Sequence, residues 1–258
     1  GTDFVMRKEV LAVGCALMML CGCGNNSAAQ HYESGWAALE KKDYSTAEQE
    51  FQQVNDLDSR LAESYRAEGI AYYSEGAYPE AIAAFSRSLN NMDDPDKEFK
   101  KDVQFYLAQA RMDYGEVDKA IEVYSEILKV GEDAQAFFLR GKAYISMDDY
   151  ENAGKDFQRA LKGCEDYNLY INIYQIYVDN NKAVDGDAYL KMALELEPQD
   201  GEDYYHRGRI YEYEKNYEAA RDELKTSMEQ GYEDAMLLLG RVYLEMEDPA
   251  SARSMYQE

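Results

Sequence analysis

The sequence predicts an all-α protein, a right-handed superhelical solenoid of about seven helix-turn-helix repeats. Its composition favours helix, because Tyr occurs 24 times against one Trp, Pro occurs only 4 times, and Ala, Leu, Glu and Lys are abundant. A small residue recurs every 32 to 39 residues, followed at fixed spacing by a second small residue and a bulky one. Short segments with Gly and Asn separate these stretches, as between paired helices. A repeat of this length is typical of stacked helical hairpins.

The register consists of three positions in each block. The first is a small residue, with Tyr174 taking its place once: Gly35, Gly69, Ala108, Gly141, Gly208 and Gly240. The second lies twelve residues on: Ala47, Ala81, Ala120, Ala153, Gly186, Ala220 and Ala252. The third is bulky and lies four further on: Phe51, Phe85, Tyr124, Phe157, Leu190, Leu224 and Tyr256. Two helices pack closely where small side chains meet at their crossing, so each block is predicted to be a hairpin.

The predicted repeats lie near residues 28–61, 62–95, 101–133, 134–166, 167–200, 201–232 and 233–258, the last incomplete. Two departures stand out. The segment Asn91 to Lys101 carries extra residues, and its run of aspartates lacks the Gly and distal Glu of a calcium loop, so we expect an ordinary turn. The fifth block has Tyr174 and Gly186 in the register, and its second helix is expected to begin late, near Asp187.

The N-terminus reads as a secretory signal, with Met6-Arg7-Lys8 leading into an apolar run over residues 10–20. That run would span about 16 Å as a helix, too short for a hydrocarbon core of about 30 Å. Its end, Leu20-Cys21-Gly22-Cys23, resembles the lipobox of bacterial lipoproteins. The resemblance implies that residues 1–22 are removed, that Cys23 is lipidated, and that residues 23–30 form a polar tether outside the cytoplasm of a bacterium. Alternatively, the cysteines here are simply apolar members of a hydrophobic run.

Net charge and residue chemistry exclude several classes of function. The charge is −24, with 51 acidic and 27 basic residues, which disfavours nucleic acid as a partner. The two histidines, His31 and His206, lie far apart in a linear array, and no nucleophile elbow or phosphate-binding loop occurs. We therefore expect no catalytic residue, metal or cofactor, and interpret paired acidic residues as helix-terminal charges.

The blocks resemble tetratricopeptide repeats over about residues 28 to 258. The segment from Ala62 to Leu89 carries the family's positions most fully, and Pro198 matches the proline that follows a second helix. The resemblance implies a scaffold that binds a protein or peptide on the concave face lined by the first helix of each hairpin. Where some members place a Lys and an Asn to hold chaperone tails, this chain has Tyr32 and Trp36, so that function is not supported.

Aromatic and cationic residues at the inward positions are the candidate partner-binding groove, since such residues are enriched where partners are held. They are Tyr32, Trp36, Arg66, Tyr73, Phe105, Phe138, Lys142, Tyr205, Arg209, Tyr213 and Arg241, with Gln109, Ile171, Gln175 and Leu237 also inward. For any single aromatic residue, a place in the core between repeats is an equal alternative. The four cations are harder to explain as core.

Two functions follow. The first is a membrane-anchored, extracytoplasmic scaffold that binds a protein or peptide through this groove and meets the membrane through its lipid only. The alternative is an accessory subunit, or the N-terminal part, of a cell-envelope enzyme whose catalytic portion lies elsewhere, because the last block stops at Tyr256 without a polar capping helix.

Overall fold

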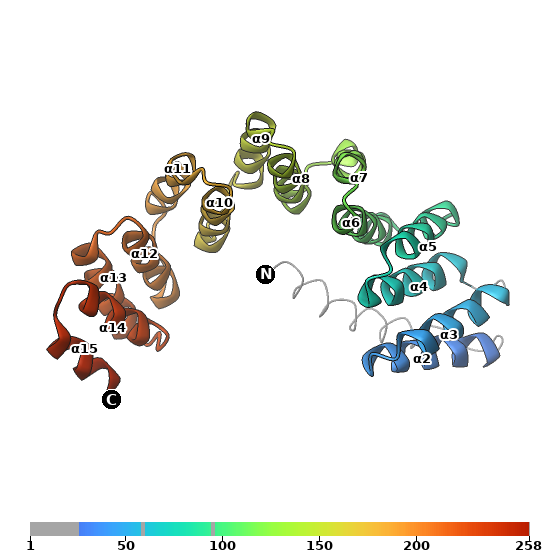
Figure 1. The fold of residues 1–258 in the computed structure, drawn as a ribbon, viewed down its shortest axis with the longest axis horizontal. Coiled ribbons are helices and arrows are strands. Elements are labelled where there is room, and N and C mark those ends of the chain that lie inside the picture. Colours follow the sequence, from blue (N-terminus) through green and yellow to red (C-terminus); the bar gives the residue numbers. More distant parts are fainter. Residues whose placement is uncertain (1–25, 58–59, 94–95, 258) are drawn as a thin grey trace. The chain divides into compact units, whose positions relative to one another are not determined.

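The computed structural model describes residues 26–57, 60–93 and 96–257, and every regular element in these ranges is a helix (Figure 1). The predicted signal segment and Cys23 therefore lie outside the described residues. The helices are α2 (Asn26–Glu40), α3 (Tyr44–Asp56), α4 (Leu61–Glu75), α5 (Tyr78–Asn90), α6 (Lys97–Tyr114), α7 (Val117–Val130), α8 (Ala134–Ser146), α9 (Tyr150–Ala160), α10 (Tyr167–Asp179), α11 (Ala183–Leu194), α12 (Gly201–Tyr213), α13 (Tyr217–Glu229), α14 (Ala235–Glu245) and α15 (Pro249–Tyr256). The predicted all-α repeat fold is confirmed.

The chain divides into two compact units, and the boundary in sequence falls between Asp156 and Phe157, inside α9. In the first unit, α2 packs on α3, α4 on α5 and α6 on α7, and each hairpin also packs on the next. In the second unit, α10 packs on α11, α12 on α13 and α14 on α15. Each unit is thus a series of hairpins joined by contacts between sequence neighbours, as in a solenoid.

The glycines of the register allow each bulky residue to lie against a helix backbone. A Cβ atom at Gly69 would lie 2.5 Å from Cε1 of Phe85, and one at Gly208 would lie 2.6 Å from Cγ of Leu224. The alanines of the second position, such as Ala81, are fully buried. The spacing between the small and the bulky residues therefore reflects the packing of the two helices within one hairpin.

Helix ends follow the predicted chemistry of turns. Asp133 accepts a hydrogen bond from the backbone N–H of Ala136 and begins α8, while Asp149 accepts one from the N–H of Asn152. These aspartates fill the N-cap and first-turn roles expected of paired acidic residues. Gly76 ends α4 with φ of 88° and Gly115 ends α6 with φ of 93°, a left-handed conformation that favours glycine.

Three details differ from the predictions. The second helix of the fifth block begins at Ala183 rather than near Asp187. Gly186 lies within this helix, and a Cβ atom there would lie 2.9 Å from Cβ of Tyr177 and 3.1 Å from the backbone oxygen of Tyr174, so the glycine allows the two helices to approach closely. Helix α6 begins at Lys97, and the extra residues of the insertion mainly lengthen it. Helix α2 begins at Asn26, so residues 26–30 of the predicted tether are helical.

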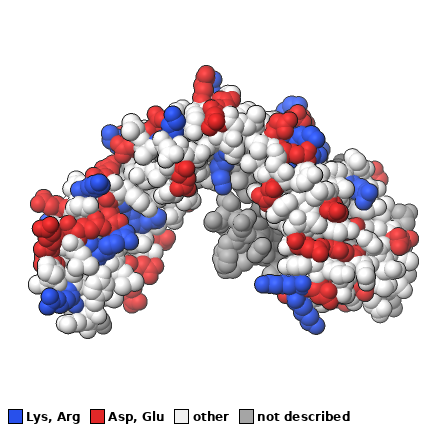
Figure 2. Space-filling model, viewed as in Figure 1, with Lys and Arg blue, Asp and Glu red and all other residues white. Residues whose placement is uncertain are grey.

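Acidic and basic side chains are interspersed on the face drawn in Figure 2. None of the helices in the described part of the chain has both the length and the apolar character needed to cross a membrane.

Candidate functional site

Five of the predicted groove residues are core residues and not surface. Their exposed fractions are 3% for Tyr32, 5% for Trp36, 2% for Arg66, 7% for Phe105 and 8% for Phe138. In the first hairpin, the rings of Tyr32 and Trp36 pack edge-to-face with each other and with Phe51, with centroids 5.6 to 6.1 Å apart. Removing these aromatic rings from water and packing them on one another stabilises the folded hairpin. The alternative interpretation as core is the correct one at these positions.

Arg66 is a structural cation. Its Nε donates to Oδ2 of Asp102 at 2.5 Å, and its guanidinium lies 5.5 Å from the centroid of the Tyr106 ring. Both partners lie on α6, so Arg66 links the first helices of two successive repeats. A buried guanidinium needs such a carboxylate, since an unpaired buried charge is costly.

Two further predicted residues lie in the first unit, on α4 and α8. The hydroxyl of Tyr73 on α4 donates to Oδ2 of Asp113 at 2.5 Å. The ammonium of Lys142 on α8 lies 5.8 Å from the centroid of the Phe138 ring. Each is partly exposed.

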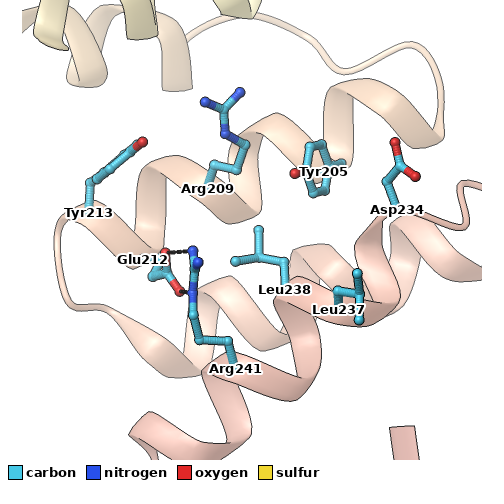
Figure 3. Close-up of a pocket in the computed structure, with 8 residues that line it drawn as sticks. All are labelled: Tyr205, Arg209, Glu212, Tyr213, Asp234, Leu237, Leu238 and Arg241. Atoms are coloured by element: carbon cyan, nitrogen blue, oxygen red, sulfur yellow. Dashed lines mark hydrogen bonds and ion pairs between the residues drawn. The ribbon is translucent and has the colours of Figure 1, made fainter. Parts of the chain in front are cut away.

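The remaining four predicted residues come together in the second unit, around one hollow between α12 and α14 (Figure 3). The hollow has a volume of about 320 Å³. Its lining comprises Tyr205, Arg209, Glu212, Tyr213, Asp234, Leu237, Leu238 and Arg241. These helices are the first helices of the sixth and seventh repeats, and successive first helices lie side by side, which brings residues about thirty apart in sequence into one site.

The hollow offers apolar surface at its base and rim. Leu238 is buried at 6% exposure, whereas Leu237 is 64% exposed and Tyr213 is 39% exposed. The ring of Tyr205 packs on that of Tyr232, with centroids 5.1 Å apart, which holds it at the edge of the hollow. Tyrosine is enriched among the residues that dominate binding at interfaces, and the exposed Leu237 adds apolar area beside two tyrosines.

One of the two cations of the hollow is already paired. Arg241 donates from Nε to Oε2 of Glu212 at 2.8 Å and from Nη2 to Oε1 at 2.5 Å (Figure 3). Hydrogen bonding to Glu212 raises the pKa of Arg241. The pair is bidentate, so the charge of Arg241 is compensated within the protein. Sequence reasoning missed Glu212, Asp234 and Leu238; the only available signal for Glu212 was its opposite charge on the preceding first helix.

Arg209 is held differently. Its Nη1 donates to Oδ1 of Asn168 at 3.2 Å and to Nδ1 of His206 at 3.1 Å, and its guanidinium lies 6.0 Å from the centroid of the Tyr205 ring. Among the residues that the structure describes, no carboxylate forms an ion pair with it. Arg209 therefore presents a positive charge that only neutral acceptors hold.

His206 is neutral near pH 7. It is 6% exposed, and burial, together with the charge of Arg209, lowers its pKa. Because a guanidinium N–H can only donate, Nδ1 of the neutral ring accepts from Arg209, which assigns the ring proton to Nε2. Nε2 lies 3.5 Å from Oε1 of Glu202, which can accept that proton, and 3.3 Å from Nδ2 of Asn168. The neutral ring accepts a hydrogen bond from Arg209 but does not compensate the positive charge of the guanidinium.

Other chemistry-bearing groups have ordinary structural surroundings. Burial raises the pKa of the Cys164 thiol, which favours the unreactive protonated form. Nδ1 of His31 lies 2.6 Å from Oε2 of Glu50, far along the chain from His206. In the described ranges, no three side chains of the His, Cys, Asp and Glu types are grouped so as to hold a metal ion.

Comparison with known proteins places these features in a family. Models described as tetratricopeptide repeat match residues 32–96, 105–168, 204–229 and 234–258, which together are more than half of the chain. Superkiller protein 3 of Schizosaccharomyces pombe is 25% identical over 142 residues, 52% of this chain and 10% of that protein, so the chain spans about a tenth of that relative's length.

Two solved structures show the same fold. A tetratricopeptide repeat protein from Parabacteroides merdae aligns with TM-score 0.50 and 18% identity, covering 84% of this chain and 99% of its own. MamA from Desulfovibrio magneticus RS-1 aligns with TM-score 0.56 and 16% identity, covering 67% of this chain and 97% of its own. By its matched repeats and its helical hairpins, the chain belongs to the tetratricopeptide repeat family.

Proposed function

We propose that the chain is a membrane-anchored, extracytoplasmic scaffold that binds a protein or peptide segment in the hollow between α12 and α14. The fold is a scaffold suited to protein–protein interaction. The observation that carries the choice of site is the combination, in one hollow, of Arg209 with the exposed apolar side chains Leu237 and Tyr213. Within the described part of the chain, Arg209 has hydrogen-bond acceptors but no ion-pair partner.

The composition of the hollow determines the kind of segment that fits it. An aliphatic or aromatic side chain can pack on Leu237, Leu238 and the tyrosine rings, which removes apolar area from water. A carboxylate can accept hydrogen bonds from Arg209, either from an acidic side chain or from a chain end. We therefore propose a partner segment that combines an apolar anchor with a carboxylate.

The anchor part of the proposal rests on the sequence alone. Cys23 ends a short apolar run preceded by basic residues, and α2 begins at Asn26, so the repeats start close to the proposed lipid. With residues 24–25 between them, the scaffold would be held near the membrane surface, because each residue reaches at most about 3.5 Å. Membrane-proximal proteins are accordingly the partners to seek.

The binding site is tested by capture of partners from native membranes with the lipidated protein and its variants. The double change Tyr205→Ala and Arg209→Ala should weaken capture by about 1 to 3 kcal/mol, as truncation of interface hot spots does. Leu237→Glu should weaken it as well, and because Leu237 is 64% exposed this change leaves the core intact.

A matched control is Val184→Glu, the same kind of change at an 89% exposed residue on α11. Glu218→Ala with Asp222→Ala on α13 is a second control for altered charge. Both controls should capture partners as the wild type does. If the α12–α14 variants keep the partner while a control variant loses it, the hollow is not the binding site.

A further inference from the structure

Arginines that reach from one helix to another in this protein generally meet a carboxylate. Such pairs are Arg66 with Asp102, Arg140 with Asp156, Arg207 with Glu223 and Arg241 with Glu212. This is the expected outcome in a chain with 51 acidic and 27 basic residues. Arg209 also reaches to another helix, from α12 to α10, yet its acceptor there is the amide of Asn168.

We infer that Asn168 and His206 are positioning residues that hold Arg209 at the hollow without neutralising it, and that they thereby set a preference for a carboxylate over a neutral group. The inference rests on the proposed function of the hollow. Asn168 supplies Oδ1 and His206 supplies Nδ1, at 3.2 and 3.1 Å from the same Nη1 atom. Two fixed acceptors on one nitrogen restrict the guanidinium, while its remaining N–H groups stay available to donate.

The neutrality of both acceptors is what the inference requires. An aspartate in place of Asn168 has nearly the same shape and would form a charge-assisted pair with Arg209. A ligand carboxylate would then compete with a carboxylate of the protein. Residue 168 is also the second residue of α10, where a negative charge is favoured by the helix dipole, so local helix structure does not require an amide there.

His206 completes the arrangement because its ring is buried and carries its proton on the far nitrogen. Oε1 of Glu202 lies 3.5 Å and Nδ2 of Asn168 lies 3.3 Å from that nitrogen, and Arg209 lies on the other side. Burial and the charge of Arg209 lower the pKa of the ring, whereas the charges of Glu202 and Asp166 favour its protonated form. A carboxylate bound to Arg209 would reduce the repulsion that opposes protonation of His206. Binding of an anion at the hollow should therefore raise the pKa of His206, whereas binding of a neutral ligand should not.

The experiment compares two probes of nearly the same shape, the anion 4-phenylbutyrate and the neutral amide 4-phenylbutyramide, added to the full chain. Nuclear magnetic resonance follows the methyl groups of Leu237 and Leu238 to measure binding, and the His206 ring to measure its pKa. The test variant is Asn168→Asp. The control is Gln135→Glu, which adds the same charge at an exposed side chain in the equivalent position, the second residue of α8.

In the wild type and in Gln135→Glu, we expect the carboxylate to bind more tightly than the amide and to raise the pKa of His206. In Asn168→Asp, the preference for the carboxylate should fall by roughly tenfold, as expected for loss of a hydrogen bond to a charged group. The affinity for the amide should stay the same. The pKa of His206 should already be raised in that variant before any probe is added.

Retention of the carboxylate preference in Asn168→Asp would overturn the positioning role. Binding of both probes with equal affinity in the wild type would also overturn it, while leaving the hollow as an apolar binding site. Absence of binding by either probe would reject the hollow as a site and the proposed function with it. A positioning role for His206 is separately supported if His206→Gln, which keeps a neutral acceptor, preserves the preference and His206→Ala reduces it.

Discussion

Replacing Gly69 with Ala tests whether the small residues of the register are required by helix packing. A Cβ atom at residue 69 would lie 2.5 Å from Cε1 and 2.6 Å from Cδ1 of Phe85. Carbon atoms in contact are normally about 3.5 to 4.0 Å apart, so the ring would have to move by about 1 Å. Phe85 is fully buried and its ring stacks on that of Tyr106, with centroids 5.5 Å apart. The ring therefore has little room in which to move.

Two effects of opposite sign set the magnitude. Alanine is favoured over glycine within a helix by about 1 kcal/mol, which would stabilise α4. Overpacking of a closely packed core costs about 1 to 3 kcal/mol, and here the added methyl group meets a rigid ring. We expect the net free energy of unfolding to fall by about 1 kcal/mol. Equilibrium unfolding in urea measures this change, and hydrogen exchange should show protection lost first in α4 and α5.

Two further variants separate overpacking from other effects. Gly131→Ala places a methyl group where nothing lies within 4 Å, in extended backbone, and should leave stability unchanged or slightly raised. Phe85→Leu in the Gly69→Ala background should recover part of the lost stability, because it replaces the rigid ring that the added methyl group meets with a smaller and more flexible side chain. If Gly69→Ala instead raises stability by about 1 kcal/mol, helix propensity alone governs this position and the packing argument fails.

Three other predictions concern charge and the anchor. Burial and the neighbouring carboxyl group of Glu75 raise the pKa of Glu48 from 4.5 to about 8, so between these pH values the folded state holds a proton that the unfolded chain releases, and stability should fall as pH rises from 4.5 to about 8. Urea unfolding at a series of pH values should show a smaller fall for Glu48→Gln, and an unchanged pH profile would contradict the pKa shift. Arg140→Met should lower the free energy of unfolding by about 3 to 5 kcal/mol, because Asp156, which is 3% exposed, loses the two hydrogen bonds that Arg140 donates to it. The double variant Arg140→Met with Asp156→Leu should recover most of the lost stability, because no buried carboxylate is then left unpaired. Cys23→Ser should move the protein from the membrane to the soluble fraction, and an unmodified N-terminus in the mature wild type, found by mass spectrometry, would refute the lipid anchor.

The sequence by itself determined the helical hairpins and their register. Spacings of twelve and four residues between small and bulky positions, such as Gly69, Ala81 and Phe85, reflect contacts within one hairpin, and such contacts are local in sequence. Helix N-caps such as Asp133 depend on contacts between residues that are even closer in sequence. These features repeat in most blocks, so each block supports the assignment of the others. In the fifth block, where Tyr174 replaces the small first residue and Gly186 replaces the usual alanine, the expected helix start was wrong.

Only the tertiary structure decided which inward residues face solvent and which cations are free. Tyr32 and Tyr205 were assigned the same kind of position, yet one is core and the other borders a hollow, because burial depends on side chains supplied by neighbouring helices. Arg209 and Arg241 each follow the glycine of the register by one residue. Arg241 meets a carboxylate from the preceding first helix, whereas Arg209 meets an amide and a neutral imidazole. His206 is only three residues from Arg209, but Glu212 and Asn168 lie 29 and 41 residues from the arginines that they contact. At those separations no periodic pattern of one sequence identifies the partner that sets the charge available to a ligand.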